Sequence, residues 1–169
     1  MPQRSPSQTV GPYFAIALPW KCGERVTGCS GERIVLEGHV LDGAGQPVPD
    51  ALVETWQAPD RNAAPSPDGK PHGFGRVSAD ATGLFRIETA MPAGTAPFLD
   101  VTILARGLLK HVHTRVYFAD EARVRAEAAM APLAASPRLA TLIARKAAAG
   151  EYRWDVRLQG EGETVFFSA

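Results

Sequence analysis

One stretch of the sequence, residues 97–118, constrains the fold more than any other. It reads PFLDVTILARGLLKHVHTRVYF, and residues 98–105 are almost all apolar or β-branched. A short apolar run of this composition favours a buried strand. Arg106-Gly107 interrupts the run, and glycine allows the backbone to turn with a positive φ. The stretch therefore predicts two strands, over residues 98–105 and 109–118, joined by a short turn.

The second predicted strand carries an unusual set of polar side chains. Because side chains alternate between the two faces of a strand, His111, His113 and Arg115 share one face with Leu109 and Tyr117. Two histidines at i and i+2 can bind a metal, but no Asp or Glu on that face of the strand completes a ligand set. We therefore favour a packing or interface role for the histidines, and expect an exposed face that meets another subunit.

Further short strands separated by turns predict the fold class. Glycine- and proline-rich turns at residues 42–47 and Asp80–Gly83 separate several β-branched segments. In the β-branched segment at 48–58, Trp56 is expected to anchor the core. This spacing predicts an all-β fold, an antiparallel β-sandwich, with residues 1–169 forming a single domain. The remaining strands are expected at 33–41, 48–58, 73–77, 84–89 and 152–158.

Two segments depart from the strand pattern. Residues 1–14 are polar and proline-bearing, and predict an extended N-terminal arm. Residues 120–149 predict a short helical insertion near the C-terminus. Asp120 can cap its first helix, and Ser136-Pro137 is a second helix start, with helical spacing up to Gly150.

Charge and composition exclude several classes of function. Lys and Arg number 18 and Asp and Glu number 18, which argues against nucleic acid or an anionic membrane as partner. No apolar run approaches the length of a membrane span, and MPQRSPSQTV has no apolar core typical of a signal peptide. Cys22 and Cys29 are spaced too loosely for a zinc knuckle. We expect a cytoplasmic protein with two free thiols.

Five segments, taken in order, carry a resemblance to a known family. They are SQTVGPYFAI at 7–16, GQPVPDALVETWQA at 45–58, GFGRVSAD at 73–80, LARGLLKHVHTRVYFADE at 104–121 and WDVRLQGEGETVFF at 154–167. With these segments the sequence resembles the protocatechuate 3,4-dioxygenases, a family of intradiol ring-cleavage enzymes with a non-haem ferric centre. The resemblance is to their alpha chains, which do not carry the catalytic iron.

The resemblance also shows where the iron ligands of the catalytic beta chains would lie. Those chains bind Fe(III) through two tyrosines and a His-x-His pair, and phenolates with imidazoles suit this hard cation. Phe98 and Asp100 occupy the expected histidine positions here. The expected tyrosine positions fall in residues 59–72 and 91–96, which contain no tyrosine. The resemblance therefore implies no metal in this chain, with Fe(III) on a homologous beta subunit.

A different role is implied for this chain, namely to complete the partner's substrate pocket. By position, the contributing residues are Thr9, Gly11, Pro12, Tyr13 and Arg115. Protocatechuate carries a carboxylate, and an anion in a closed site needs a cation or donor nearby.

The resemblance further implies a hetero-oligomer of alpha and beta chains. With O2 it would convert protocatechuate to 3-carboxy-cis,cis-muconate in the β-ketoadipate pathway of aromatic degradation, and the isolated chain would be inactive.

Two alternatives remain open on the residues alone. The first is a stand-alone dioxygenase whose ligands have moved to other histidines and tyrosines of the chain. The second is a non-catalytic, transthyretin-like binding or structural module. The candidate ligands for the first are His39, His72, His111, His113, Tyr13, Tyr117 and Tyr152.

Overall fold

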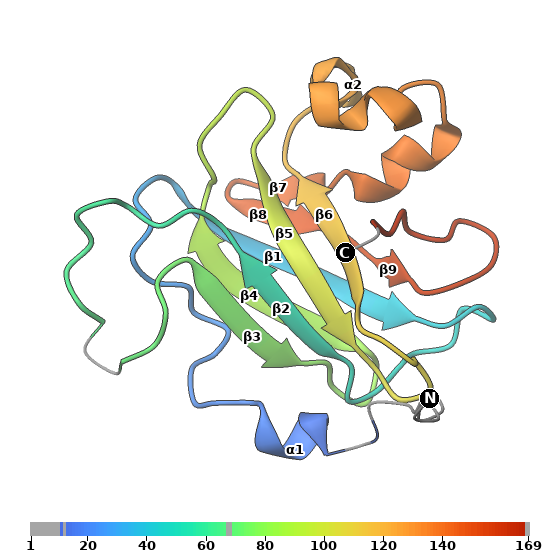
Figure 1. The fold of residues 1–169 in the computed structure, drawn as a ribbon, viewed down its shortest axis with the longest axis horizontal. Helices are drawn as coiled ribbons and strands as arrows, with labels where there is room; N and C mark the ends of the chain where they lie inside the picture. Colours follow the sequence, from blue (N-terminus) through green and yellow to red (C-terminus); the bar gives the residue numbers. More distant parts are fainter. Residues whose placement is uncertain (1–10, 12, 67–68, 168–169) are drawn as a thin grey trace, which may run out of the picture.

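The computed structural model describes residues 11, 13–66 and 69–167, and over these residues the chain forms two layered β-sheets (Figure 1). The first sheet has the strand order β4-β1-β8-β7, with β9 also paired to β1, and the second has the order β3-β2-β5-β6. The pairs are antiparallel except that β1 runs parallel to β8 and β9. The predicted antiparallel sandwich is confirmed. The strands are β1 (Arg33–Leu41), β2 (Leu52–Trp56), β3 (Phe74–Ser78), β4 (Leu84–Ala90), β5 (Phe98–Leu104), β6 (Val112–Tyr117), β7 (Arg145–Ala148), β8 (Glu151–Arg153) and β9 (Val156–Arg157).

The main hydrophobic core lies between the two sheets, because each strand presents every second side chain inward. Along β1 the buried positions alternate with half-exposed ones, and along β5 Leu99, Val101 and Ile103 are buried. Phe85 of β4 packs edge to face against Trp154, with the ring centroids 6.4 Å apart. Each such buried side chain contributes about 1.5–3 kcal/mol of transfer free energy.

The expectation that Trp56 anchors the core is wrong. Its side chain is 46% exposed, because the alternation along β2 turns Val53 and Thr55 inward and Glu54 and Trp56 outward. Trp154, which is 3% exposed, is the buried tryptophan between the sheets instead.

The hairpin of β5 and β6 forms as predicted, but its connection is longer. β6 begins only at Val112, so Leu109 and His111 precede the strand and do not belong to its face. Arg115 and Tyr117 do share a face, yet Tyr117 is only 1% exposed. The exposed strand face predicted from the alternation is therefore restricted to His113 and Arg115, both partly buried.

The predicted helical insertion is present but shorter than expected. It contains α2 (Glu121–Ala126) and two 3-10 helices, η1 (Ala128–Leu133) and η2 (Pro137–Leu142). Both predicted caps form, since Asp120 accepts from the Arg123 N–H and Ser136 accepts from the Arg138 N–H.

The helical spacing predicted up to Gly150 is wrong beyond Leu142. Residues Arg145–Ala148 form β7, which pairs with β8 at the edge of the first sheet. The predicted strand over 152–158 is likewise split into β8 and β9.

The helical segment covers one end of the outer face of the second sheet. A second hydrophobic cluster forms there around Tyr117, to which α2 contributes Val124 and η2 contributes Leu139 and Leu142. From near the C-terminus, Val165 joins the cluster, and its carbonyl accepts from Thr114 Oγ1 at 2.7 Å. The rest of this outer face stays uncovered by the helical segment.

At the N-terminal end, a four-residue helix, α1 (Phe14–Ala17), lies where the sequence predicted arm and loop. Arg76 of β3 holds the end of this helix against the second sheet, because its Nη1 donates to the carbonyl of Leu18 at 3.1 Å. Arg76 also donates to Glu54 and lies 4.6 Å from the ring centroid of Trp20. Among the described residues, no helix is long and apolar enough to cross a membrane.

Gly38 of β1 provides a sharp test of the packing between the strands. A Cβ at this position would lie 1.6 Å from the carbonyl oxygen of Trp154, which is backbone and has little room to move. We expect Gly38→Ala to lower the free energy of unfolding by at least about 2 kcal/mol, measured by urea unfolding. Gly43→Ala is the control, because its Cβ would meet only ordinary contacts from 3.5 Å. Equal stability of the two variants would contradict this packing.

Candidate functional site

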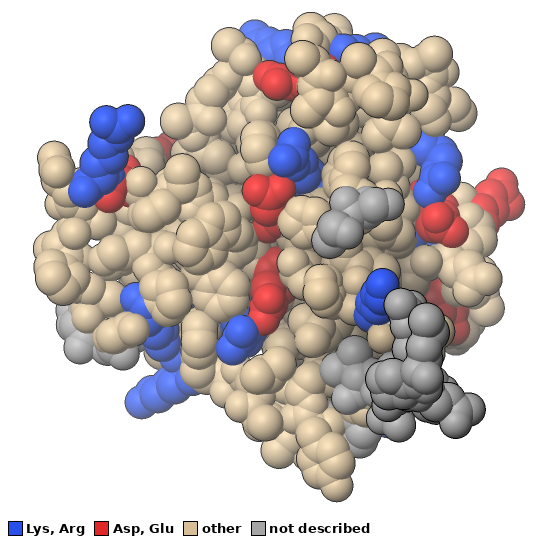
Figure 2. Space-filling model, viewed as in Figure 1, with Lys and Arg blue, Asp and Glu red and all other residues tan. Residues whose placement is uncertain are grey.

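The uncovered part of the second sheet's outer face carries two of the polar residues that the sequence singled out, His113 and Arg115. The pairing of β3, β2, β5 and β6 places side chains from all four strands in two adjacent rows across this face. Figure 2 shows the molecule from this side, with acidic and basic side chains next to one another near the middle of the face. The rows are Phe74–Trp56–Asp100–Arg115 and Arg76–Glu54–Thr102–His113.

Arg115 of β6 is held by contacts from the neighbouring strand. Its Nε donates to Asp100 Oδ1 at 2.9 Å, and its guanidinium carbon lies 4.4 Å from the ring centroid of Phe98. Burial by itself would lower the pKa of Arg115, but hydrogen bonding to Tyr117 and to Asp100 outweighs burial and raises that pKa. The side chain is therefore a permanent cation that remains 29% exposed.

His113 belongs to the same cluster. Its Nε2 lies 3.6 Å from Asp100 Oδ1, and its Nδ1 lies 3.4 Å from Thr102 Oγ1. No acidic residue of β6 itself lies on this face, and for that reason the alternation along one strand does not predict an acidic partner. Asp100 reaches this face from β5. A hollow of about 310 Å³ opens beside the cluster, lined by Glu54, Thr55, Trp56, Phe74, Asp100, Thr102, His113 and Arg115.

A second hollow, of about 330 Å³, shares Trp56 and Asp100 with the first. Its lining includes Phe98 and Asp100 and part of 91–96, where the resemblance located iron ligands, together with residues that directly precede the segment 59–72. The structure therefore brings these separate positions together. The lining residues are Trp56, Gln57, Ala58, Pro92, Ala93, Phe98 and Asp100.

The residues of this second hollow do not fit an iron centre. Phe98 offers no donor atom, and the Gln57 amide oxygen accepts from Thr89 Oγ1 at 3.2 Å. The Asp100 carboxylate is engaged by Arg115. Within the described part of the chain, no three His, Cys, Asp or Glu side chains converge on a common point.

The relocated-ligand alternative gains no support from the geometry. His39 lies 3.3 Å from Asp155, and His72 contacts the carbonyl of Ala64 at 2.7 Å. These contacts lie in different parts of the molecule from His113, so the histidines do not form one site.

Of the predicted arm residues, the structure describes Gly11 and Tyr13. Gly11 has φ 74°, and Tyr13 at the start of α1 is 75% exposed. Thr9 and Pro12 lie outside the described residues. Leu18, after α1, is bonded to Arg76 of β3, whereas Arg115 is on β6, and three strand spacings of about 4.8 Å, or about 14 Å, separate these two strands.

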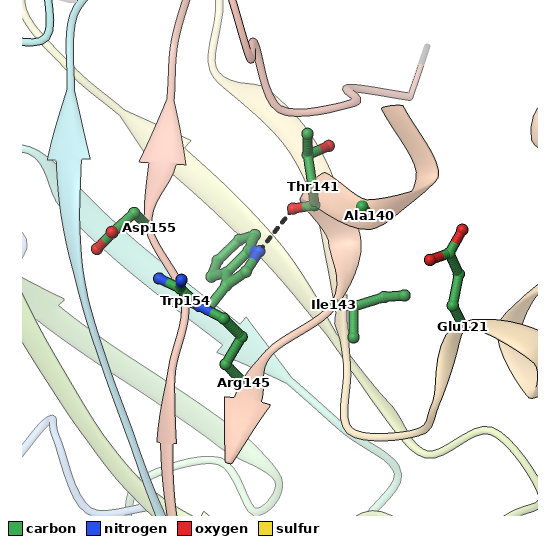
Figure 3. A pocket seen from close by; sticks show the side chains of 7 residues that line it. All are labelled: Glu121, Ala140, Thr141, Ile143, Arg145, Trp154 and Asp155. Atoms are coloured by element: carbon green, nitrogen blue, oxygen red, sulfur yellow. Dashed lines mark hydrogen bonds between the residues drawn. The ribbon is translucent and has the colours of Figure 1, made fainter. Parts of the chain in front are cut away.

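A larger cavity elsewhere, of about 410 Å³, is not lined by any predicted site residue (Figure 3). The indole of Trp154 crosses it and donates to the carbonyl of Thr141 at 2.8 Å. Asp155 accepts from the backbone N–H of His39 at 2.9 Å. The two contacts tie the connection between β8 and β9 to η2 and to β1, so we assign this cavity a structural role.

Comparison with known proteins decides the family. Residues 23–98 match the family model described as Dioxygenase. Over 191 aligned residues, the chain is 40% identical to the protocatechuate 3,4-dioxygenase alpha chain of Burkholderia cepacia, covering 98% of this chain and 97% of the relative. The chain belongs to the intradiol dioxygenases, among the protocatechuate 3,4-dioxygenase alpha chains.

Two further matches show how this alpha chain relates to other intradiol dioxygenases. A protocatechuate 3,4-dioxygenase beta chain of Burkholderia cepacia is 44% identical over 71 residues, which cover 37% of this chain and 30% of that one. A dioxygenase domain from a Streptomyces fusion protein is 22% identical, with a TM-score of 0.54 over 94% of this chain and 99% of that domain. This last likeness shows the shared fold alone.

The lining of the second hollow yields a direct test of metal binding. The full-length chain, expressed alone in iron-rich medium, should contain far less than one iron per chain by mass spectrometry. It should also lack the visible absorption band that tyrosinate bound to Fe(III) produces. The same measurements on the chain co-expressed with a beta chain serve as the positive control. A coloured protein with one iron per isolated chain would contradict the assignment.

Proposed function

We propose that this chain is the alpha subunit of a protocatechuate 3,4-dioxygenase and completes the pocket of an iron-bearing beta subunit. The complex uses O2 to split protocatechuate between its two hydroxylated carbons, giving 3-carboxy-cis,cis-muconate for the β-ketoadipate pathway. Because both cysteines are unpaired thiols, we propose the cytoplasm as its location.

The observation that carries the proposal is a hollow whose lining does not fit an iron centre, with a charged arginine beside it. The loops that frame the second hollow offer Ala58, Pro92 and Ala93, which have no ligating side-chain atoms. Arg115 lies on the adjoining surface, charged and partly accessible. Such a chain retains the family's scaffold while offering a cation rather than a metal.

Arg115 suits the carboxylate of protocatechuate. Asp100 and Tyr117 engage part of its guanidinium, and the remaining N–H groups can form charge-assisted hydrogen bonds to a carboxylate. A desolvated substrate anion left unpaired would be costly, so a cation at this place favours binding. The protein's own residue thus orients and neutralises the substrate, while the redox chemistry belongs to the partner's metal.

The arm is proposed to act alongside Arg115. The positive φ of Gly11 lets the main chain bend, and the exposed phenol of Tyr13 is available to a partner. The residues that follow α1 are bonded to β3, and Arg115 is on β6, so the two lie at opposite edges of one sheet. A beta subunit that covered this face would contact both edges. Thr9 and Pro12 are assigned to the same arm contact by their positions in the sequence.

Replacement of Arg115 tests the substrate contact. Loss of one charge-assisted hydrogen bond costs about 1.5–3 kcal/mol, so Arg115→Ala should lower kcat/KM for protocatechuate by roughly one to two powers of ten. Catechol, which lacks the carboxylate, should be cleaved at nearly the same rate by both proteins. Arg145→Ala, a change outside this face, is the control. Equal losses on both substrates would show a structural role for Arg115.

The exposed apolar side chains predict the behaviour of the chain alone. Ile16, Trp56 and Leu109 are 76%, 46% and 60% exposed, and a beta subunit that covered them would bury apolar surface. Sedimentation of the isolated chain should show self-association that increases with concentration. Co-expression with a beta chain should replace it with one discrete hetero-oligomer. A stable monomer over a wide concentration range would count against the proposed interface.

A further inference from the structure

Phe98 and Asp100 stand where the catalytic chains are expected to carry their His-x-His pair, and both contact Arg115. Phe98 lies beneath the guanidinium, at 4.4 Å from ring centroid to guanidinium carbon, and Asp100 accepts from Nε at 2.9 Å. The strand register explains the contact, because Asp100 lies directly opposite Arg115 and Phe98 opposite Tyr117. The same two positions of β5 that would hold a metal in a catalytic chain hold a cation here.

We propose that Asp100 is a positioning residue that fixes the orientation of Arg115 toward the carboxylate of the substrate. The inference rests on the proposed function, because it assumes that Arg115 meets the substrate. Asp100 itself does not contact the substrate in this proposal and acts only through the guanidinium.

The geometry favours positioning because the contacts leave part of the guanidinium available. A guanidinium has five N–H groups in one plane, of which the bond to Asp100 uses the Nε–H and the hydrogen bond to Tyr117 uses another. Packing on Phe98 fixes the plane, and the Nε bond fixes the rotation within that plane. The terminal nitrogens are then held in one direction before the substrate arrives, which reduces the conformational entropy lost on binding.

Asp100 could either compete with the substrate for Arg115 or position Arg115 for the substrate. The two roles predict opposite effects of removing Asp100 on substrate binding. A carboxylate next to Arg115 repels the substrate anion, so a residue that merely competed for Arg115 would weaken binding. Its removal would then strengthen binding. If Asp100 positions Arg115, its removal weakens binding even though a repulsive charge has gone.

The test uses the alpha–beta complex with Asp100→Ala and Asp100→Asn. Asp100→Ala should raise the KM for protocatechuate about three- to tenfold, as expected for one lost hydrogen bond, with a smaller change in kcat. Asp100→Asn should stay within about twofold of the unmodified complex, because its amide oxygen still accepts from Nε–H. Glu163→Ala is the control, since it removes a carboxylate that accepts from Arg138 at 2.9 Å outside this face.

Two comparisons separate this inference from the proposed function. Catechol kinetics should be unaffected by either Asp100 variant, and Asp100→Ala should add nothing when Arg115 is already alanine. Should Arg115→Ala itself spare protocatechuate, the proposed function fails before Asp100 is considered. If Arg115→Ala has its full effect but Asp100→Ala has none, strengthens binding or affects both substrates equally, the positioning role is overturned.

Discussion

The structure depends on burial of the inward faces of two β-sheets against each other. A strand buries alternate side chains, so a strand that commits Leu99 and Val101 to the core commits Asp100 to the opposite face. The polar cluster of the candidate site is a geometric consequence of that commitment. The helical segment then covers one end of the outer face through Tyr117, which leaves Arg115 at the border between covered and open surface.

The position of Arg115 at this border explains why its side chain is partly exposed and also held by neighbouring residues. A fully exposed arginine would be mobile and screened, whereas a fully buried one would require complete compensation of its charge. At 29% exposure, with Asp100 as counterion and Phe98 beneath it, the guanidinium is both ordered and reachable. The start of β5 thus supports an organic cation in this chain.

Much of the fold could be predicted from local patterns. The alternation over residues 33–41 marks β1 with the bounds that the structure has, and Asp120 and Ser136 cap the helices that they precede. Prediction failed where long-range pairing competes with local preference. Arg145–Ala148 has helical spacing but pairs with β8, and Trp56 has the size of a core residue but falls on the outward side of β2.

The sequence by itself determined the family, because motif spacing is a property of the chain order. It also identified Arg115 as the candidate cation. Only the tertiary structure decided what Arg115 touches, since Asp100 is 15 residues away and becomes its partner through the register of β5 and β6. Strand register arises from packing of the whole sheet, and one strand's alternation cannot specify which neighbour lies opposite.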